Sequence, residues 1–541
     1  MENRTCATAI ERRQNYLNLQ KKKGDRAVCG NSRGISLLSI AGKVLAKVLL
    51  IRLNKYIVDV VCPETQCGFR RKRGTTDMIF TARQLQEKCS EQHQNLCLAF
   101  IDLTKAFDTV NREMLWQIMQ KFGCPDKFIA VTRAFHDGMK ASVVIGSEET
   151  ATFSVERGVK QGCVIAPIMF NIYLAAATAL FRERLSPGHG IGLIYRLNGS
   201  LFNLRRLQAQ PRISHDKVTD LQYADDCVLV SHSPEGLQKA LNVIYDIYNT
   251  LGLVINANKT EVMYQWSGVA PQVEPIMSIG GAELKISHQF NYLGSILSAN
   301  CSIDEEVNRR INKASASFGR ICKQVVQNHN LRLATKVAVY RAVCLSTLLY
   351  GSETFTLYRK HIKILEAFHM QCIKKILGLT WQDRVPHTDM LKHAGLPSIE
   401  SLLLGRQLKW LGHVFRMPTT RLPKKVLYGQ LSEGRRTCGG QKKRFKDQAM
   451  TTLRNFKIDP DSFENAAADR VGWRSACHQG AAHFEAERTQ QRNERRQRRH
   501  GRGLQPHPPL APHIQCPECG RHCGSRIGLY SHRRTHSPMK R

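Results

Sequence analysis

The chain has 541 residues, of which 42% are hydrophobic, so it contains enough apolar material for several packed cores and a wholly disordered protein is excluded. Lysine and arginine total 80 against 44 acidic residues, which gives a formal net charge of +36. This excess favours a polyanionic partner, with nucleic acid as the leading candidate. The longest apolar runs, such as residues 44–53, are shorter than the ~20 residues that cross a bilayer. No membrane partner is therefore expected.

The distribution of residue types divides the chain into five parts. A basic, solvated segment comes first, followed by alternating strand-like and helical patterns that predict an α+β unit. Helical periodicity with few strand-like runs then predicts an all-helical unit. The next part is basic, with an arginine-dominated stretch that lacks apolar residues, and is expected to be a partly disordered linker or polyanion-binding tail. A Cys/His pattern ends the chain. In order, the parts are residues 1–30, 31–300, 301–430, 431–512 and 513–541.

Residues 1–23 are polar and basic, without the apolar stretch of a secretory signal. The chain is therefore expected to be intracellular. The 18 cysteines would lie in a reducing compartment as free thiols, apart from any that bind a metal.

Two apolar segments predict a site built from carboxylates. Asp102 follows an apolar strand at residues 96–101, although a single aspartate in this position more often caps the next turn. In a second apolar segment, Asp225 and Asp226 separate two short strand-like runs, which predicts a hairpin with carboxylates at its tip. Adjacent ionised carboxylates repel each other, so a divalent cation is expected to neutralise them. Oxygen ligands favour Mg²⁺ or Mn²⁺, and two such ions about 3.5 to 4 Å apart suit phosphoryl transfer.

These segments also resemble conserved blocks of reverse transcriptases. The motif YADD resembles their YxDD box, and the segment from Phe100 through Asp102 to Phe107 resembles their first catalytic block. Five further blocks occur in the expected succession, and this order is more specific than any single block. The chain is thereby similar to reverse transcriptases of non-LTR (LINE-type) retrotransposons over residues 31–297, with weaker similarity to their helical thumb as far as about residue 429. The further blocks are residues 31–38 (NSRGISLL), 66–70 (QCGFR), 157–163 (RGVKQGC) with Pro167, 252–256 (GLVIN) with Lys259 and Thr260, and 290–294 (FNYLG).

The resemblance implies an α+β right-hand polymerase. Fingers and a palm with an antiparallel sheet would occupy residues 31–300, and an all-helical thumb or connection would follow. The implied activity is RNA-directed DNA polymerisation, in which deoxynucleoside triphosphates extend a DNA primer on an RNA template. Asp102 and Asp225 would each ligate two Mg²⁺ or Mn²⁺ ions with help from the Leu103 carbonyl, while Asp226 would support the site.

The resemblance also implies residues that contact the substrate. Phe107 would act as a steric gate against the ribose 2′-hydroxyl, although a core phenylalanine is an equally good interpretation. Gln161 and Gly162 would form the turn beneath the incoming nucleotide. Arg70 and Arg71 are candidates for binding the triphosphate, but a basic run is more often a solvated face. Lys259 resembles a lysine proposed to donate a proton to pyrophosphate, and a plain surface lysine is equally compatible.

A separate pattern near the end of the chain predicts a zinc site. Cys516, Cys519, His532 and His536 have the spacing C-x2-C-x12-H-x3-H, which is typical of a ββα zinc finger of the two-Cys, two-His kind. Cys523 stands where such fingers have a core phenylalanine, so the finger would be less stable or Cys523 would compete as a ligand. Binding to DNA, to RNA or to protein all stay open for this finger.

Two alternatives to an active retrotransposon polymerase are open. The chain is either a catalytically inactive relic that only binds nucleic acid, or a reverse transcriptase of another branch, such as a group II intron maturase or a telomerase. Residues 31–38 and the helical region with Trp381 and Trp410 favour the retrotransposon interpretation. No nuclease core is recognised after residue 430, so the chain is expected to be a fragment of a longer protein or a degraded genomic copy. Its expected location within the cell is the nucleus.

Overall fold

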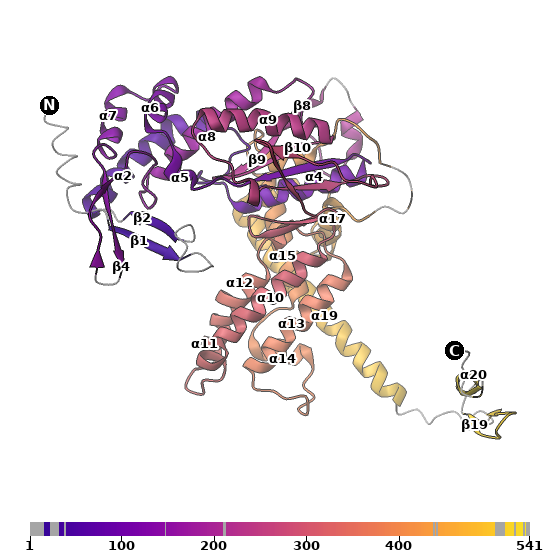
Figure 1. The fold of residues 1–541 in the computed structure, drawn as a ribbon. Coiled ribbons are helices and arrows are strands. Elements are labelled where there is room, and N and C mark those ends of the chain that lie inside the picture. The colour runs from indigo at the N-terminus through magenta and orange to yellow at the C-terminus, as the bar shows by residue number, and fades with distance from the viewer. Residues whose placement is uncertain are drawn as a thin grey trace.

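The computed structural model describes residues 16–21, 32–36, 39–145, 148–208, 212–436, 439, 442–503, 514–523, 526–533 and 536. A mixed α/β body carries a column of helices, and a small module of two strands and a helix lies beyond the last long helix (Figure 1). Most of the predicted basic segment at residues 1–30, and Asn31 of the first polymerase block, lie outside the described residues.

A five-stranded sheet lies at the centre of the α/β body. Its order is β14-β11-β3-β10-β9, and β3 pairs antiparallel with both of its neighbours. All six residues of β3 are buried, because helices or a hairpin cover both faces of the sheet. The strands are β14 (Lys285–Ile286), β11 (Glu261–Gln265), β3 (Leu96–Ile101), β10 (Asp226–Ser231) and β9 (Asp220–Tyr223).

The alternating residues of β3 pack into two different cores. Cys97, Ala99 and Ile101 face α8 (Ala166–Arg184) and α9 (Pro234–Thr250). On the opposite face, Leu96, Leu98 and Phe100 pack against α4 (Thr75–Glu91) and the hairpin of β15 (Gln289–Tyr292) and β16 (Ser295–Ser298). This is the two-residue period of a strand buried on both sides.

Smaller elements complete the α/β body. A second sheet has the order β2-β1-β4-β5, with β6 also paired to β4, and a third has the order β17-β7-β8. The strands are β1 (Tyr16–Lys21), β2 (Ser32–Ser36), β4 (Lys140–Ile145), β5 (Glu148–Glu149), β6 (Phe153–Ser154), β7 (Ile191–Tyr195), β8 (Ser214–Val218), β12 (Ser278–Ile279), β13 (Ala282–Glu283) and β17 (Gln430–Leu431). The helices are α2 (Ile40–Leu53), α3 (Asp59–Val61), α5 (Ala106–Thr109), α6 (Arg112–Lys121) and α7 (Asp126–Ala134), with short turns η2 (Asn54–Val58), η3 (Leu204–Gln208) and η5 (Ala257–Lys259).

The predicted helical unit is present. Residues 304–428, all of which the structure describes, contain helices and no strand. Buried apolar side chains between Ile303 and Leu403 form a core of their own, whereas Leu422 and Val426 pack into a core of the central sheet. The helices are α10 (Asp304–Ile321), α11 (Leu333–Tyr340), α12 (Ser346–Leu348), α13 (Arg359–Ile376), α14 (His387–Ala394), α15 (Ile399–Phe415) and α16 (Leu422–Tyr428), with η6 (Cys322–Val326), η7 (Arg341–Leu345) and η8 (Ser352–Thr354) between them.

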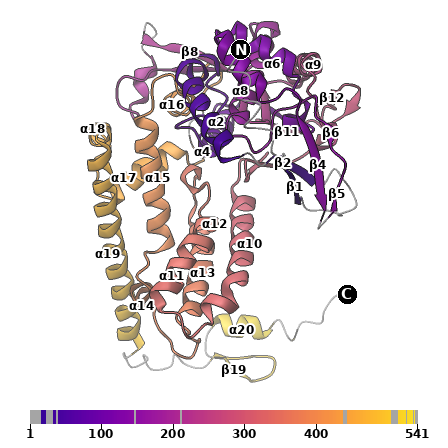
Figure 2. The ribbon, with the colours of Figure 1, turned by 90° about the vertical axis from the view of Figure 1, so that its left-hand side faces the viewer.

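The predicted linker is wrong for residues 445–503. This part forms α17 (Phe445–Asn455), α18 (Phe463–Ala468) and the long α19 (Arg470–Gly503), and α19 runs beside α15 (Figure 2). Apolar side chains at helical spacing, among them Phe445, Phe463 and Trp473, pack against α15 in a fourth core. The average composition conceals these residues, because they are few and lie on one side of each helix.

The arginine-dominated stretch is also partly integrated into the fold. Arg488 is buried, and its guanidinium donates to the Glu366 carboxylate at 2.6 Å. Further along α19, Arg495 and Arg498 are exposed. Part of the predicted polyanion-binding tail is therefore helical, and Arg488, the first arginine of that stretch, serves packing.

Two general expectations can be compared with the described residues. No helix among them is long and apolar enough to span a membrane. The cysteines that the structure describes are free thiols, and most of them are buried.

The contact between α15 and α19 gives a test of this packing. A Cβ added to Gly412 would overlap the Trp473 indole, whereas a Cβ added to Gly405 on the same helix would meet no atom within 4 Å. We expect Gly412→Ala to destabilise the folded chain by about 1 to 3 kcal/mol through overpacking. Gly405→Ala is expected to be neutral or stabilising by up to about 1 kcal/mol, because alanine is the better helix former. Chemical denaturation of the two variants measures the difference, and equal effects would contradict the observed packing.

Candidate active site

The register between β3 and β10 brings the three predicted carboxylates to one edge of the central sheet. Cys227 of β10 lies opposite Ile101 of β3 in an antiparallel ladder. The next positions along the two strands are Asp226 and Asp102, so these residues mark neighbouring strand ends at the same edge. Asp225 precedes Asp226 in the tight turn between β9 and β10. That turn holds one aspartate rather than the predicted two, because Asp226 already pairs with Tyr223 in the ladder.

Asp102 is held at the strand end by the segment that follows α9. The Asn256 N–H donates to the Asp102 carbonyl at 2.8 Å, and the Asp102 N–H donates to the Thr260 hydroxyl at 3.4 Å. The Lys259 ammonium lies 3.6 Å from the Asp102 carboxylate, and 38% of the Asp102 side chain is exposed. The predicted Lys259 and Asp102 are therefore brought together with an open face toward solvent.

The Leu103 carbonyl is directed toward the same edge. Leu103 forms an isolated antiparallel bridge with Ile255, and the hydrogen bonds of that bridge are made by the flanking residues. Thr104 donates to the Val254 carbonyl at 2.8 Å, and Asn256 donates to the Asp102 carbonyl. In such a pair the central residue turns its own N–H and C=O to the other side of its strand. For Leu103 that is the side on which β10 begins.

Gln66 holds the turn that carries Asp225. Ala224 has a left-handed backbone (φ +56°), and its N–H donates to the Gln66 side-chain oxygen at 2.9 Å. The Gln66 amide in turn donates to the Ala224 carbonyl at 3.2 Å. Gly68 lies directly against this turn, where a Cβ would overlap the Ala224 backbone nitrogen. The sequence predicted a family block at residues 66–70 but no role for either residue, because their contact with the turn depends on tertiary structure.

Asp220 anchors the other strand of the hairpin and was not predicted from the sequence. Its carboxylate is fully buried and accepts hydrogen bonds from Thr65 and Thr219, each at 2.7 Å, and from Gln222 at 3.1 Å. The Arg182 guanidinium pairs with it at 3.1 Å. The sequence gives no local signal for this role, because the four-residue strand contains a second polar residue, Gln222.

Phe107 packs against two other aromatic rings. It is half-buried in α5 and stacks on Phe170, with ring centroids 4.6 Å apart. It also makes a T-shaped contact with Phe69, with ring centroids 6.3 Å apart. The part that stays exposed leaves both the gate and the core interpretation open.

The turn with Gln161 and Gly162 is attached to the helix that carries Phe107. The Val159 N–H donates to the Phe107 carbonyl at 2.8 Å. Gly162 has φ +111°, a conformation that favours glycine, and it is exposed while Gln161 is partly buried. This hydrogen bond therefore holds the predicted substrate-binding residues Gln161 and Gly162 near Phe107.

The structure separates the two arginines that the sequence left equivalent. Arg70 is buried, and its guanidinium donates to the Pro63 carbonyl at 2.7 Å and to the Gln66 carbonyl at 3.2 Å. Arg71 is exposed. Arg70 thus supports the loop that contains Gln66, and Arg71 is the one that faces solvent.

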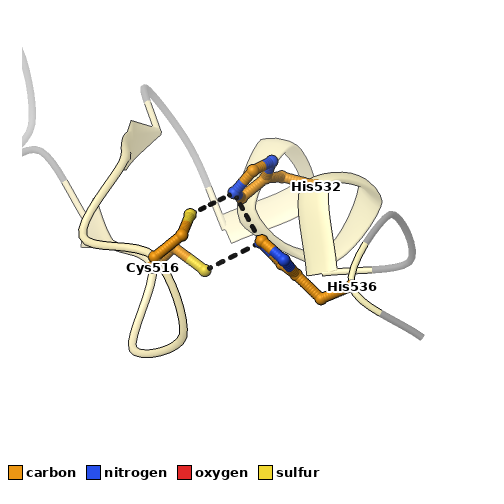
Figure 3. Close-up of side chains that lie close together, drawn as sticks. Cys516, His532 and His536 are labelled. Atoms are coloured by element: carbon orange, nitrogen blue, oxygen red, sulfur yellow. Dashed lines mark hydrogen bonds between the residues drawn. The ribbon is translucent and has the colours of Figure 1, made fainter. Parts of the chain in front are cut away.

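The predicted zinc ligands meet at the C-terminal module, which consists of β18 (Ile514–Gln515), β19 (His522–Cys523) and α20 (Arg526–Arg533). The Cys519 sulfur lies 3.0 Å from His532 Nε2, and the Cys516 sulfur lies 3.8 Å from His536 Nε2 (Figure 3). All four ligand atoms lie within 4.8 Å of one another, and Cys523 is outside the group. Two thiols and two imidazoles at this spacing suit tetrahedral Zn²⁺.

Among the described residues this is the one group of at least three Cys, His, Asp or Glu side chains close enough to hold a metal ion. The carboxylates of the three aspartates at the sheet edge do not lie as close together as these four ligand atoms do. Three like charges are expected to separate unless a cation lies between them.

Comparison with known proteins identifies the family. Residues 20–297, just over half of the chain, match the family described as "Reverse transcriptase (RNA-dependent DNA polymerase)", so the chain belongs to the reverse transcriptases. Among its relatives are proteins of mobile elements, some of them named as RNA-directed DNA polymerases. One is the RNA-directed DNA polymerase from mobile element jockey of Drosophila funebris, 24% identical over 364 residues, or 65% of this chain and 36% of the relative. Another is the Pol polyprotein from the type-1 retrotransposable element R2 of Popillia japonica, 22% identical over 66% of this chain and 47% of the relative.

These relatives confirm the resemblance to reverse transcriptases of non-LTR retrotransposons. The chain spans between about a third and a half of the length of the two relatives. Solved telomerase structures have a lower sequence identity to this chain than the two relatives do. One from Candida tropicalis, in complex with a fragment of telomeric RNA, is 13% identical with a TM-score of 0.38, and the match covers 77% of this chain and 64% of that chain. A likeness of this extent has no bearing on the site.

The close approach of Gly68 to the turn at Ala224 generates a second test. Gly68→Ala is expected to destabilise the folded chain by about 1 to 3 kcal/mol, because the new Cβ meets backbone atoms that cannot rotate away. Gly74→Ala in the same loop is the matched control, since the nearest atom to its Cβ lies 3.9 Å away. Its effect is expected to stay below about 1 kcal/mol. Thermal denaturation compares the two, and a larger loss for Gly74→Ala would contradict the described loop.

Proposed function

We propose that this chain is the RNA-directed DNA polymerase of a non-LTR retrotransposon and that it extends a DNA primer on an RNA template. The observation that carries the proposal is the register of β3 and β10, which brings Asp102, Asp225 and Asp226 to one sheet edge. Membership of the reverse transcriptase family supports it. Since the chain spans only part of its relatives, its activity, template and primer are inferred from the site.

The residues at this edge fit two hard divalent ions. Asp102 and Asp225 would ligate both ions, the Leu103 carbonyl is directed to the same side, and Asp226 would support the site. Oxygen donors alone favour Mg²⁺ or Mn²⁺ over Zn²⁺. The chemistry supplied there when the ions are bound is a lower pKa for the primer 3′-hydroxyl and neutralisation of the pyrophosphate that leaves.

The chain's own residues would bind and orient the deoxynucleoside triphosphate. Lys259, whose side chain is 57% exposed and whose ammonium lies 3.6 Å from the Asp102 carboxylate, is suited to donate a proton to the leaving pyrophosphate. Phe107 would meet the ribose, with Gln161 and Gly162 beneath the base. Arg71 is the better candidate for a triphosphate contact, because the Arg70 guanidinium is occupied by backbone carbonyls.

The wider organisation follows from the same proposal. Residues 31–300 would form fingers and palm, residues 301–430 the thumb or connection, and α17 to α19 would extend that helical part. The net charge of +36 supports binding of nucleic acid along this body. A retrotransposon polymerase acts on chromosomal DNA, so we place the protein in the nucleus.

Replacement of the aspartate in the turn tests the polymerase proposal. Asp225→Ala is expected to lower primer extension on an RNA template with Mg²⁺ or Mn²⁺ by more than about a hundredfold, because even partners outside the first shell of a metal are worth ten- to a hundredfold. Asp246→Ala, at an exposed position within α9, is the control and should keep wild-type activity. Extension of a labelled primer by purified full-length protein provides the measurement.

Two results would reject the proposal. Wild-type extension by a folded Asp225→Ala protein would remove the aspartate from the chemistry. A folded wild-type chain that binds primed RNA without extending it would instead be the nucleic-acid-binding relic.

We further propose that Cys516, Cys519, His532 and His536 bind one Zn²⁺ and that the module is a ββα zinc finger. The four ligand atoms lie within 4.8 Å of one another, and so small a module has few apolar residues to stabilise it without a metal. The choice of DNA, RNA or protein as its target is left to binding experiments.

Metal content tests the zinc proposal. The full-length chain is expected to contain one Zn²⁺, and Cys516→Ser is expected to lose it, because a serine hydroxyl does not supply the thiolate ligand. Cys523→Ser is the matched control and should retain the ion, since Cys523 is not among the four clustered residues. Elemental analysis after dialysis decides, and retention in Cys516→Ser or loss in Cys523→Ser would refute the ligand set.

A further inference from the structure

A single arginine from the helical unit is inserted into the loop beside the candidate active site. Arg421 immediately precedes α16 and is buried. One terminal nitrogen of its guanidinium donates to the Lys72 carbonyl at 3.0 Å, and the other donates to the Asp77 carboxylate at 2.9 Å. Its Nε lies 3.2 Å from the Glu64 carboxylate. All three contacts reach one short stretch, residues 64–77, which lies more than 300 residues earlier in the chain.

The buried carboxylate of Asp77 depends on this cation. Asp77 is as buried as Arg421, and its second carboxylate oxygen accepts the Gly74 N–H at 2.6 Å. Burial raises the pKa of the Asp77 carboxyl, and the Arg421 guanidinium opposes that shift. Glu64 also pairs with Arg73. A buried carboxylate that loses its partner is strongly destabilised, so the position of this stretch depends on Arg421.

The same stretch holds the turn that carries Asp225. Between Glu64 and Asp77 lie Thr65, which donates to Asp220, and Gln66, which bonds both the N–H and the carbonyl of Ala224. The backbone contributes as well. The Cys67 N–H donates to the Gln222 carbonyl at 3.0 Å, and the Gln222 N–H donates to the Thr65 carbonyl at 2.9 Å.

We propose that Arg421 is a positioning residue for nucleotidyl transfer: it fixes residues 64–77 so that Gln66 keeps Ala224, and with it Asp225, in place. The inference rests on the proposed polymerase function and deepens it. A helix beyond the palm would then set the geometry of the catalytic turn, in addition to any contact that the helical unit makes with nucleic acid.

The same interface supplies a control that separates positioning from general docking. At the far end of α4, Arg444 pairs with Glu91 at 2.9 Å and with Asp447 at 2.8 Å. This ion pair also connects α4 to the C-terminal helices, but it does not touch residues 64–77. If both arginines only held the helices against α4, replacing either one would have the same effect on activity. The positioning role predicts a larger effect for the replacement of Arg421.

Two measurements on the full-length protein test the proposal. Peptide-resolved hydrogen exchange follows the Ala224 amide, which Gln66 protects, and steady-state primer extension follows kcat and KM for the deoxynucleotide. Arg421→Gln and Gln66→Ala are each expected to accelerate exchange at the turn. Each should also lower kcat by about ten- to a hundredfold with KM changed by less than about twofold, because a small misplacement of a reacting group acts on the chemical step. Arg444→Gln should change neither quantity.

A double-mutant cycle asks whether Arg421 acts through Gln66. The Gln66→Ala/Arg421→Gln protein is expected to lose no more kcat than the more impaired single variant, whereas independent residues would multiply their losses. Multiplied losses, or wild-type exchange at Ala224 in Arg421→Gln, overturn the proposal.

A conservative variant covers the case in which Arg421→Gln does not fold. Arg421→Lys keeps a positive charge for Asp77 but lacks the planar fork that reaches three partners. Faster exchange at Ala224 in this variant supports the proposal, and wild-type exchange overturns it. A wild-type chain that shows no extension at all would refute the polymerase function instead, and the exchange measurement would still report on the contact between Arg421 and the turn.

Discussion

The antiparallel pairing of β3 with β10 is the constraint on which the rest of the structure depends. It buries β3 on both faces, and it ends both strands at the edge where Asp102, Asp225 and Asp226 lie. A shift of one residue in this register would turn the apolar side chains of β10 to the opposite face and would move the aspartates away from Asp102. Two cores on opposite sides of the sheet prevent such a shift, so hydrophobic packing is what fixes the position of the charged groups.

Buried carboxylates paired with arginine recur throughout the molecule. Three of the four pairs connect residues at least 38 positions apart, and the fourth lies within α10. An arginine suits this role because its planar fork reaches several oxygens at once. Each such pair is neutral overall, so the net charge of +36 is carried by the remaining residues of the chain. The pairs are Asp77 with Arg421, Asp220 with Arg182, Glu306 with Arg310, and Glu366 with Arg488.

The C-terminal helices differ from the division into parts that composition predicts. From composition, residues 431–512 predict a linker, yet α17, α18 and the first part of α19 share a core with α15, and Phe445 of α17 contacts Phe80 of α4. The helical unit is consequently continuous with the segment after it, and it reaches back to the loop beside the candidate site through Arg421. Sequence composition averages over a window, whereas packing depends on which few side chains share one face of a helix.

The sequence by itself determined the features that depend on local spacing. The strand before Asp102, the hairpin around Asp225 and the four clustered Cys/His residues all follow from short-range patterns, and the structure contains each of them. Only the tertiary structure decided which polar residues serve the site indirectly. Gln66 contacts Ala224, and Arg421 contacts Asp77, across long stretches of chain. No local pattern encodes such contacts, because they depend on the register of the sheet and on how its covering helices pack.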